Sequence, residues 1–543
     1  MAGDDHSIIR ARRPRGSTGH SVRRDDPDIR AAHRQDAAHY PGGYTPGVCF
    51  PETEADVAAI VRATERVLPI GAQSSLTGGA TPFGDTVLST ARMNRILEWT
   101  TTGVRVEPGV VLATLDTALT ERGRYYPPIP TYDGATVGGT VATNAAGAAT
   151  FKYGTTRAWV DAVTIVLANG DVIDLQRGAT HATAEGSIGI LGTDGVTRTI
   201  HLPNYETPDL PKVSAGYFVR PDMDPIDLFI GSEGTLGVIT EVELRLCATR
   251  PAWLVGLIPL PDEPRALTLA SALRNAAHDT WRSGDDTGVD VAAVEYLDHR
   301  CLALLREDDT PRRLGVHFPS SAQAALLFQA ELPPGTSHQE TADALAASTD
   351  PSHQSRVACL ARLLDAHGAL AATIAALPGD DTRRRALFAF REAVPAAVNQ
   401  RLGDRQRTVD PSISKSASDV IVPFARLREA LVAYREIFNR HGLDYAIWGH
   451  VSDGNLHPNA LPRTRRDMDK ARAAQLAIGE ATIALGGCPM AEHGTGRNSV
   501  KKALLEQFYG EESVTAMRQI KRTLDPTGKL APNVLFDLDP TPT

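Results

Sequence analysis

Residues 69–79 of the chain read PIGAQSSLTGG, a run of small and hydroxyl-bearing residues that follows a short apolar segment. Two further runs have the same character: TVGGTVATNAAG at 136–147 and GSEGTLGVIT at 231–240. Small residues let backbone N–H groups converge on an anion, because no side chain blocks their approach. None of the three matches GxGxxG after a strand or GxxxxGK[ST], which disfavours a dinucleotide Rossmann domain and an NTPase. One such run alone is more often a tight turn, but three together favour an extended, phosphate-bearing cofactor.

The segments around these loops alternate helix and strand signals. Thr53 followed by Asp56 resembles a capping box, and helical apolar spacing continues after it. Asn169-Gly170 lies between two β-prone runs, which predicts a hairpin. Apolar and charged residues alternate over 238–246, as in a half-buried strand. We therefore predict an α+β domain over residues 41–250.

Beyond residue 250 long Ala/Leu/Arg-rich stretches predict helices, including one near 425–441 that stops at Gly442. A strand at 444–448 then leads into a Gly- and His-containing loop. We predict a second domain over residues 251–543. Residues 1–40 are rich in Arg, Asp and His with few large apolar groups, which predicts a flexible arm.

That loop reads GHVSDGNLH at 449–457, and AEHGTGR follows at 491–497. Two imidazoles and a carboxylate suit a divalent metal such as zinc or manganese, with positions left open for substrate. A lone histidine is usually a packed or exposed residue, but the grouping here favours the metal interpretation. The zinc-hydrolase motif HExxH is absent.

Charge and composition argue against several classes of partner and site. A net charge of -9 over 543 residues disfavours a nucleic-acid partner, although the arm contains a basic stretch. No apolar run approaches the ~20 residues of a transmembrane helix. The five cysteines contain no CxxC pair, which suits reduced thiols in a cytoplasm and provides no iron–sulfur or zinc-cysteine site. We expect a cytoplasmic protein without an integral membrane segment; attachment to the inner face of the membrane is compatible with this.

The motifs carry a family resemblance over roughly residues 45–538. The first half resembles the FAD-binding domain of the vanillyl-alcohol-oxidase or PCMH-type flavoproteins: PIGAQSSLTGG resembles the pyrophosphate loop and KVSAGY (212–217) a segment that approaches the flavin. The second half, with GHVSDGNLH and AEHGTGR, resembles the C-terminal domain of FAD-linked oxidases. That family includes D-lactate and D-2-hydroxyglutarate dehydrogenases and the glycolate oxidase D subunit. The resemblance implies an α+β fold with a two-part PCMH-type domain, a substrate or cap domain containing an antiparallel sheet, and a C-terminal helical segment.

The resemblance also implies site roles. His450, His457 and Glu492 hold the metal, and His493 is the catalytic base. Arg391 in FREAVP clamps the substrate carboxylate, and Lys415 in ISKSASDVIVP is a second cationic contact. The residues expected at FAD are Pro69, Gly71, Ala72, Gln73, Ser74, Ser75, Leu76, Gly78, Gly79, Thr136, Gly138, Gly139, Thr143, Asn144, Gly147, Tyr153, Glu233, Gly234, Gly237, Ile239 and Asn455. The first loop contains no histidine, so we expect FAD to be bound without a covalent link.

We therefore expect FAD-dependent oxidation of a small D-2-hydroxy acid, with the metal acting on the hydroxyl and hydride passing to flavin N5. Electrons then pass to an external acceptor such as a quinone, a cytochrome or an electron-transfer flavoprotein. Pro395 stands where the resemblance places a threonine, which favours a monocarboxylic, D-lactate-like substrate over D-2-hydroxyglutarate. An oxygen-using oxidase, a D-2-hydroxyglutarate dehydrogenase and a non-catalytic metal- or anion-binding protein remain alternatives. A homodimer is compatible with the resemblance, but the residues do not decide the oligomeric state.

Overall fold

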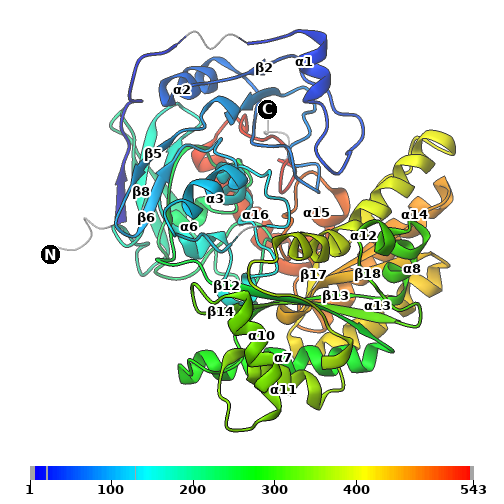
Figure 1. Ribbon diagram of the computed structural model, residues 1–543. Helices are drawn as coiled ribbons and strands as arrows, with labels where there is room; N and C mark the ends of the chain where they lie inside the picture. Colours follow the sequence, from blue (N-terminus) through cyan, green and yellow to red (C-terminus); the bar gives the residue numbers. More distant parts are fainter. Residues whose placement is uncertain (1–6, 20–22, 129, 539–543) are drawn as a thin grey trace. The chain divides into compact units, whose positions relative to one another are not determined.

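The computed structural model of the chain describes residues 7–19, 23–128 and 130–538. The chain divides into two compact units. Unit 1 contains Met1–Gly147, Gly154–Ala248 and Cys488–Thr543, and unit 2 contains Ala148–Tyr153 and Thr249–Gly487. Figure 1 labels their helices and strands. No helix among the described residues is both long enough and apolar enough to cross a bilayer.

The described residues of unit 1 form three small sheets. A parallel sheet has the order β2-β4-β3, with β2 Val48–Cys49, β3 Val67–Ile70 and β4 Thr86–Ser89. An antiparallel sheet has the order β5-β6-β11-β7-β8, with β5 Ile96–Trp99, β6 Gly103–Val106, β7 Val160–Val166, β8 Val172–Gln176 and β11 Val238–Arg245. The third sheet has the order β1-β9-β10, with β1 Ile8–Arg10, β9 Ser187–Leu191 and β10 Thr197–His201.

Local sequence signals predicted several of these elements correctly. Helix α2 (Glu54–Ala63) begins with the expected capping box between Thr53 and Asp56. Strands β7 and β8 form the hairpin around Asn169-Gly170. In β11 buried residues alternate with partly exposed ones, as the alternation of apolar and charged residues predicted. The α+β prediction for this part of the chain is confirmed.

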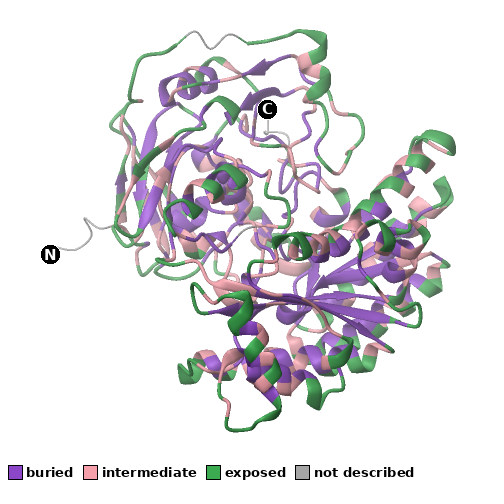
Figure 2. Cartoon of the chain, in the orientation of Figure 1, coloured by how far each residue is buried: buried purple, intermediate pink, exposed green. Residues whose placement is uncertain are grey.

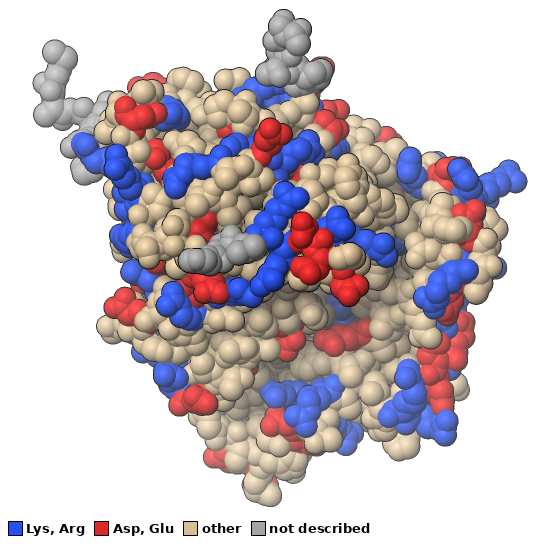
Figure 3. All heavy atoms as spheres, turned by 90° about the horizontal axis from the view of Figure 1, so that it is seen from above, with Lys and Arg blue, Asp and Glu red and all other residues tan. Residues whose placement is uncertain are grey.

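The N-terminal arm differs from the expectation of a flexible tail over the part that the structure describes. Strand β1 pairs with β9, and Ile9 is buried. Arg12 forms ion pairs with Glu54 and Asp174, which lie far along the chain. Charge composition alone could not reveal these partners. On the face drawn in Figure 3, basic and acidic side chains are interspersed. Residues 1–6 and 20–22 of the predicted arm lie outside the described residues.

Unit 2 contains one eight-stranded sheet whose pairs are all antiparallel. Its order is β15-β12-β14-β13-β18-β19-β16, with β17 also paired to β19. The strands are β12 Ala252–Leu260, β13 Val291–Leu297, β14 Ala324–Leu332, β15 Ile374–Ala376, β16 Ser416–Ala417, β17 Val420–Ile421, β18 Tyr445–His450 and β19 Asn455–Ala460. The predicted antiparallel sheet of the second domain is present.

Helices cover both faces of this sheet. One face packs against α7 (Glu263–Ser283), α11 (Arg356–Ala366), α13 (Leu427–His441) and α14 (Arg465–Ala484). The other packs against α8 (His299–Glu307) and α12 (Asp381–Thr408). Figure 2 shows the central strands buried and exposed residues on the outer sides of the helices. Gly442 ends α13 in the left-handed conformation, as predicted.

The C-terminal segment returns to unit 1, whereas the sequence assigned all of 251–543 to one domain. Helices α15 (Ser499–Tyr509) and α16 (Glu511–Leu524), labelled in Figure 1, belong to this segment, and α16 packs beside β10. Buried cations anchor the segment: Arg497 donates to Asp85 at 2.7 Å, and Lys521 donates to the carbonyl of Thr235 at 2.6 Å. The helical composition of the segment contains no signal of which unit it joins.

Candidate functional site

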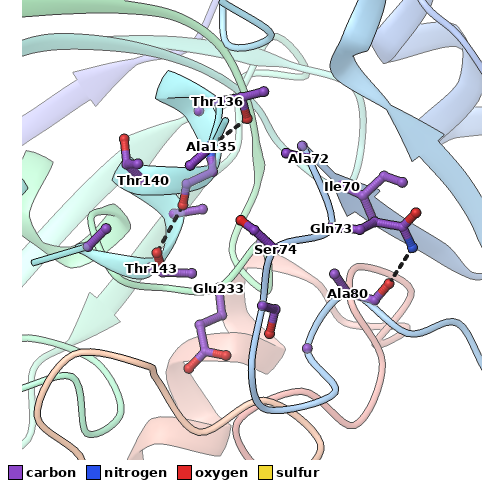
Figure 4. A pocket seen from close by; sticks show the side chains of 18 of the residues that line it. Ile70, Ala72, Gln73, Ser74, Ala80, Ala135, Thr136, Thr140, Thr143 and Glu233 are labelled. Carbon is purple, nitrogen blue, oxygen red and sulfur yellow. Dashed lines mark hydrogen bonds between the residues drawn. The ribbon is translucent and has the colours of Figure 1, made fainter. Parts of the chain in front are cut away.

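The three small-residue loops meet at one pocket of unit 1. Its volume is about 280 Å³, and residues from 69–80, 135–146 and 232–239 line it. Figure 4 shows the first loop facing the helix that begins at Thr136, with Glu233 beside both. Glu492 and His493 also line this pocket. The sequence predicted each of these segments separately, and the fold brings them together.

The first loop is closed by its own side chains. Gln73 has a positive φ of 52° and donates to the carbonyls of Ala80 and His33, so its amide holds the loop (Figure 4). A Cβ on Gly71 would lie 2.2 Å from Thr136 Oγ1, so only glycine permits the approach of the second loop. Gly78 does not line the pocket; it makes a turn against the ring of Tyr40.

The second loop enters helix α4 (Val137–Thr143), where Thr136 caps the helix by accepting from the N–H of Gly139. A Cβ on Gly138 would lie 2.4 Å from Pro108, so this position also requires glycine. Asn144 ends the helix in the left-handed conformation and accepts from the backbone N–H of Arg157. Asn144 therefore holds the turn and does not line the pocket, and Gly147 is outside the lining as well.

The third loop is tied to the segment that carries His493. The carboxylate of Glu233 accepts from the backbone N–H groups of Thr495 and Gly496, at 2.8 and 2.9 Å. Burial raises the pKa of Glu233 to about 7, although both hydrogen bonds act in the opposite direction. The side chain of His493 is 24% exposed and lies 3.5 Å from a Glu492 oxygen. The other Glu492 oxygen accepts from buried Lys212 at 2.9 Å.

In unit 2 the carboxylate of Glu295 bridges two predicted site residues. It lies 2.8 Å from Nδ1 of His450 and 3.1 Å from Nη2 of Arg391. Burial alone would raise the pKa of Glu295, but the charges of Arg391 and His450 outweigh it and hold the pKa at about 2. Within the described chain, Nε of Arg391 is buried and has no hydrogen-bond partner.

The second predicted histidine lies on the next strand of the same hairpin. The rings of His450 and His457 are perpendicular, with centroids 5.4 Å apart. Nδ1 of His457 lies 3.6 Å from Asp419, which also accepts from the amide of Asn455. The predicted metal ligands are thus divided between the units, with Glu492 in unit 1 and both histidines in unit 2.

Residues 262–535 match the family described as FAD linked oxidases, C-terminal domain, and residues 45–176 match the FAD binding domain. The chain belongs to the FAD-linked oxidases. The pocket formed by the three loops is accordingly the candidate FAD site of a flavoprotein oxidoreductase.

Among similar proteins, the FAD-linked oxidase is 29% identical to mitochondrial D-2-hydroxyglutarate dehydrogenase of Bos taurus, over 89% of this chain and 75% of that protein. It is 27% identical to glycolate oxidase subunit GlcD of Bacillus subtilis, over 87% and 84% of the two chains. It is also 27% identical to D-lactate dehydrogenase of Anaerostipes hadrus, over 88% and 86%.

Two solved structures share the fold. One is 4-ethylphenol oxidase from Gulosibacter chungangensis, with a TM-score of 0.59, 18% identity and coverage of 95% of this chain and 94% of that one. The other is alkyldihydroxyacetonephosphate synthase, with a TM-score of 0.59, 16% identity and coverage of 94% and 83%. These likenesses support the expected PCMH-type FAD-binding fold.

The residues of the pocket fit an extended phosphate-bearing cofactor, because glycines admit close approach and hydroxyl groups can donate to it. Of the residues predicted to contact FAD, these line the pocket: Pro69, Gly71, Ala72, Gln73, Ser74, Ser75, Leu76, Gly79, Thr136, Gly138, Gly139, Thr143, Glu233, Gly234, Gly237 and Ile239. Tyr153 and Asn455 belong to unit 2, where Tyr153 donates to Glu331 and Asn455 donates to Asp419. Their contact with FAD stays a prediction.

Sequence reasoning missed three charged residues beside the predicted ones. Lys212 was noticed only as part of a flavin-approaching segment, yet it pairs with Glu492. Asp419 lies in the segment that was quoted for Lys415, and it is buried near His457. Glu295 could have been found from its pattern, because it is the one charged residue in the otherwise apolar run VAAVEYL.

Proposed function

We propose that this FAD-linked oxidase oxidises a D-2-hydroxy acid to the 2-oxo acid. The observation that carries the proposal is the position of His493, a partly exposed imidazole in the wall of the candidate FAD pocket. The three relatives are named for glycolate, D-lactate and D-2-hydroxyglutarate, which are all 2-hydroxy acids. Oxidation of a 2-hydroxy acid removes one proton from the hydroxyl and one hydride from the carbon that bears it, so the site needs a base next to a hydride acceptor.

His493 is the proposed base. Its exposed edge can accept the proton of the substrate hydroxyl, and the adjacent carboxylate of Glu492 stabilises the imidazolium that forms. When bound, FAD supplies the hydride acceptor and a divalent metal supplies a Lewis acid for the hydroxyl and carboxylate oxygens.

The proposed metal ligands are His450, His457 and Glu492, with zinc or manganese as the ion. The donor set fits such an ion: Nδ1 of His450 faces a carboxylate, which favours the tautomer whose Nε2 carries no hydrogen and can ligate a metal. Asp419 provides a further buried carboxylate beside His457.

Arg391 is proposed to bind the carboxylate of the substrate. Its guanidinium is buried, and its Nε has no partner within the described chain, so an anion would satisfy a donor that is otherwise costly to bury. One turn further along α12 stands Pro395, which offers no side-chain donor. A second carboxylate would therefore depend on another cation, and we propose a monocarboxylic substrate resembling D-lactate.

Lys415 supports the alternative diacid substrate. No ion pair or hydrogen bond of its ammonium group is found among the described residues, and burial lowers its pKa to about 8. A second substrate carboxylate would compensate such a cation. D-2-hydroxyglutarate dehydrogenation is therefore the second candidate function.

We propose an external electron acceptor, such as a quinone, a cytochrome or an electron-transfer flavoprotein. The test of the whole proposal is a panel of D- and L-2-hydroxy acids with an artificial dye acceptor, assayed under nitrogen and in air. We expect the D-acids to bleach the flavin and reduce the dye. Absence of bleaching by every acid would overturn the proposal, and stoichiometric hydrogen peroxide in air would identify an oxygen-using oxidase instead.

A further inference from the structure

Glu295 is a charged residue in a strand that is otherwise apolar. Every residue of β13 is buried, and Glu295 itself is 5% exposed. Removing a carboxylate from water is costly unless it is paired and hydrogen-bonded, so its partners account for its position. Those partners come from two other elements: His450 from the neighbouring strand β18 and Arg391 from helix α12.

The carboxylate determines which nitrogen of His450 carries a proton. An ionised carboxylate only accepts hydrogen bonds, so the 2.8 Å contact requires a hydrogen on Nδ1 of His450. In neutral imidazole the other nitrogen, Nε2, then carries no hydrogen, and this is the tautomer that ligates a metal ion through Nε2. Glu295 thus selects the ligating tautomer without touching the metal.

The same carboxylate fixes one side of Arg391. Its second oxygen lies 3.1 Å from Nη2, and Nε is left buried without a partner in the described chain. A guanidinium held in this way presents its remaining donors in one orientation, which suits recognition of a carboxylate.

We propose that Glu295 is a positioning residue that prepares the metal ligand His450 and the substrate-binding Arg391 at the same time. This inference rests on the proposed function, because it assigns a metal to His450 and a carboxylate to Arg391. Glu295 does not contact substrate; it acts through the two side chains that it holds.

Replacement by glutamine tests both roles, because an amide has one oxygen and one NH₂ group in place of two acceptors. If the NH₂ faces His450, the proton of that imidazole is favoured on Nε2 and metal binding is weakened. If it faces Arg391, two donors oppose each other and the clamp is displaced. Either orientation of the glutamine amide therefore changes a measurable property.

Glu263 provides a matched control. Its carboxylate also bridges an arginine and a second polar side chain, Arg435 and Tyr296, and Tyr296 follows Glu295 in the same strand. E263Q also replaces a paired carboxylate by an amide, so it should lower the stability of the fold as E295Q does. Its metal affinity and KM should stay at wild-type values.

The experiment uses full-length, FAD-loaded enzyme from which metal has been removed with a chelator. Zinc or manganese is titrated back against a chelating dye, and kcat and KM are measured separately after reloading. We expect E295Q to bind metal about 10- to 100-fold more weakly or to raise KM about tenfold, with wild-type FAD content. E295D retains a carboxylate but is one carbon shorter, and we expect a smaller loss.

Wild-type metal affinity and KM in E295Q would overturn the inference, and so would equal losses in E295Q and E263Q. If E295Q does not fold, E295D decides, and wild-type behaviour of that variant overturns the inference. A wild-type enzyme that binds no metal would overturn the metal part of the proposed function together with this inference. That outcome is distinguishable from failure of the inference alone, in which the wild type binds metal and turns over normally.

Discussion

The carboxylate of Glu233 accepts the backbone N–H of Thr495 at 2.8 Å, which joins two segments 262 residues apart in the chain. One of these segments is the third loop of the candidate FAD pocket, and the other begins with Glu492 and His493. Gly494 has a φ of 73°, which favours glycine, and a Cβ there would lie 2.6 Å from a Glu233 oxygen, so the carboxylate would have to shift. The hydrogen bond therefore places the proposed base at the wall of the pocket.

This contact predicts a pH effect. Burial raises the pKa of Glu233 to about 7 from an ordinary value of 4.5, so the folded protein holds this proton more tightly than the unfolded chain does. The stabilisation is complete below pH 4.5 and is lost as the pH rises through 7. Relative to wild type, E233Q should become progressively more stable from pH 5 to pH 8. Denaturant unfolding of cofactor-free protein measures this, and a pH-independent difference would contradict it.

The proposed base predicts a specific kinetic loss. His493→Gln should lower kcat by about 10²- to 10⁴-fold, because proton transfer from the hydroxyl loses its acceptor. FAD content should not change, since residues of the three loops, not this imidazole, provide most of the lining. Stopped-flow flavin reduction under nitrogen gives the rate of the chemical step. Reduction within threefold of wild type would remove His493 from the mechanism.

Most of the FAD pocket could be predicted from the sequence, because its signals are local. Gly71 and Gly138 are required by close approach, and runs of small residues report this directly. Glu295 was missed because its role depends on strand pairing and helix packing: its partners lie 96 and 155 residues further along the chain. The anchoring role of Lys521 could not be predicted from the sequence for the same reason. Only the fold shows that its ammonium group donates to the carbonyl of Thr235.

The proposed ligand set predicts that bound metal can be removed by mutation while the flavin stays bound. His457→Ala should abolish stoichiometric zinc or manganese and nearly all turnover, while the flavin spectrum remains. The reason is that His457 belongs to unit 2, whereas the loops of the candidate FAD pocket belong to unit 1. Metal analysis of chelator-free preparations provides the readout. An active wild-type enzyme without metal would contradict this ligand set.

A non-covalent flavin is predicted from the residues of the pocket. Among the described residues that line it, His493 is the only histidine and cysteine is absent, so its lining offers few side chains for a covalent link. Acid precipitation should leave the yellow colour in the supernatant. Colour that stays with the pellet would show a covalent attachment.

The last prediction concerns the second carboxylate of a diacid substrate. The pKa of Lys415 is lowered to about 8 from 10.5 by burial, so its charge is lost as the pH rises above 8. We propose that this charge pairs with a second substrate carboxylate. A bound carboxylate would move this loss to higher pH. For D-2-hydroxyglutarate, kcat/KM should therefore fall above pH 8 more steeply than for D-lactate, and Lys415→Ala should remove the difference.

At pH 7 we expect wild type to favour D-lactate or a longer D-2-hydroxy monoacid over the diacid. Arg391 can satisfy one carboxylate, and its pairing with Glu295 occupies part of its donor capacity. Pro395, one helical turn away, adds no donor, so a desolvated second carboxylate would depend on Lys415, its proposed partner. Lys415→Ala should leave monoacid oxidation nearly unchanged and further weaken use of the diacid. A tenfold preference of wild type for the diacid, about 1.4 kcal/mol in the barrier, would refute the monoacid assignment and make Lys415 its principal specificity contact.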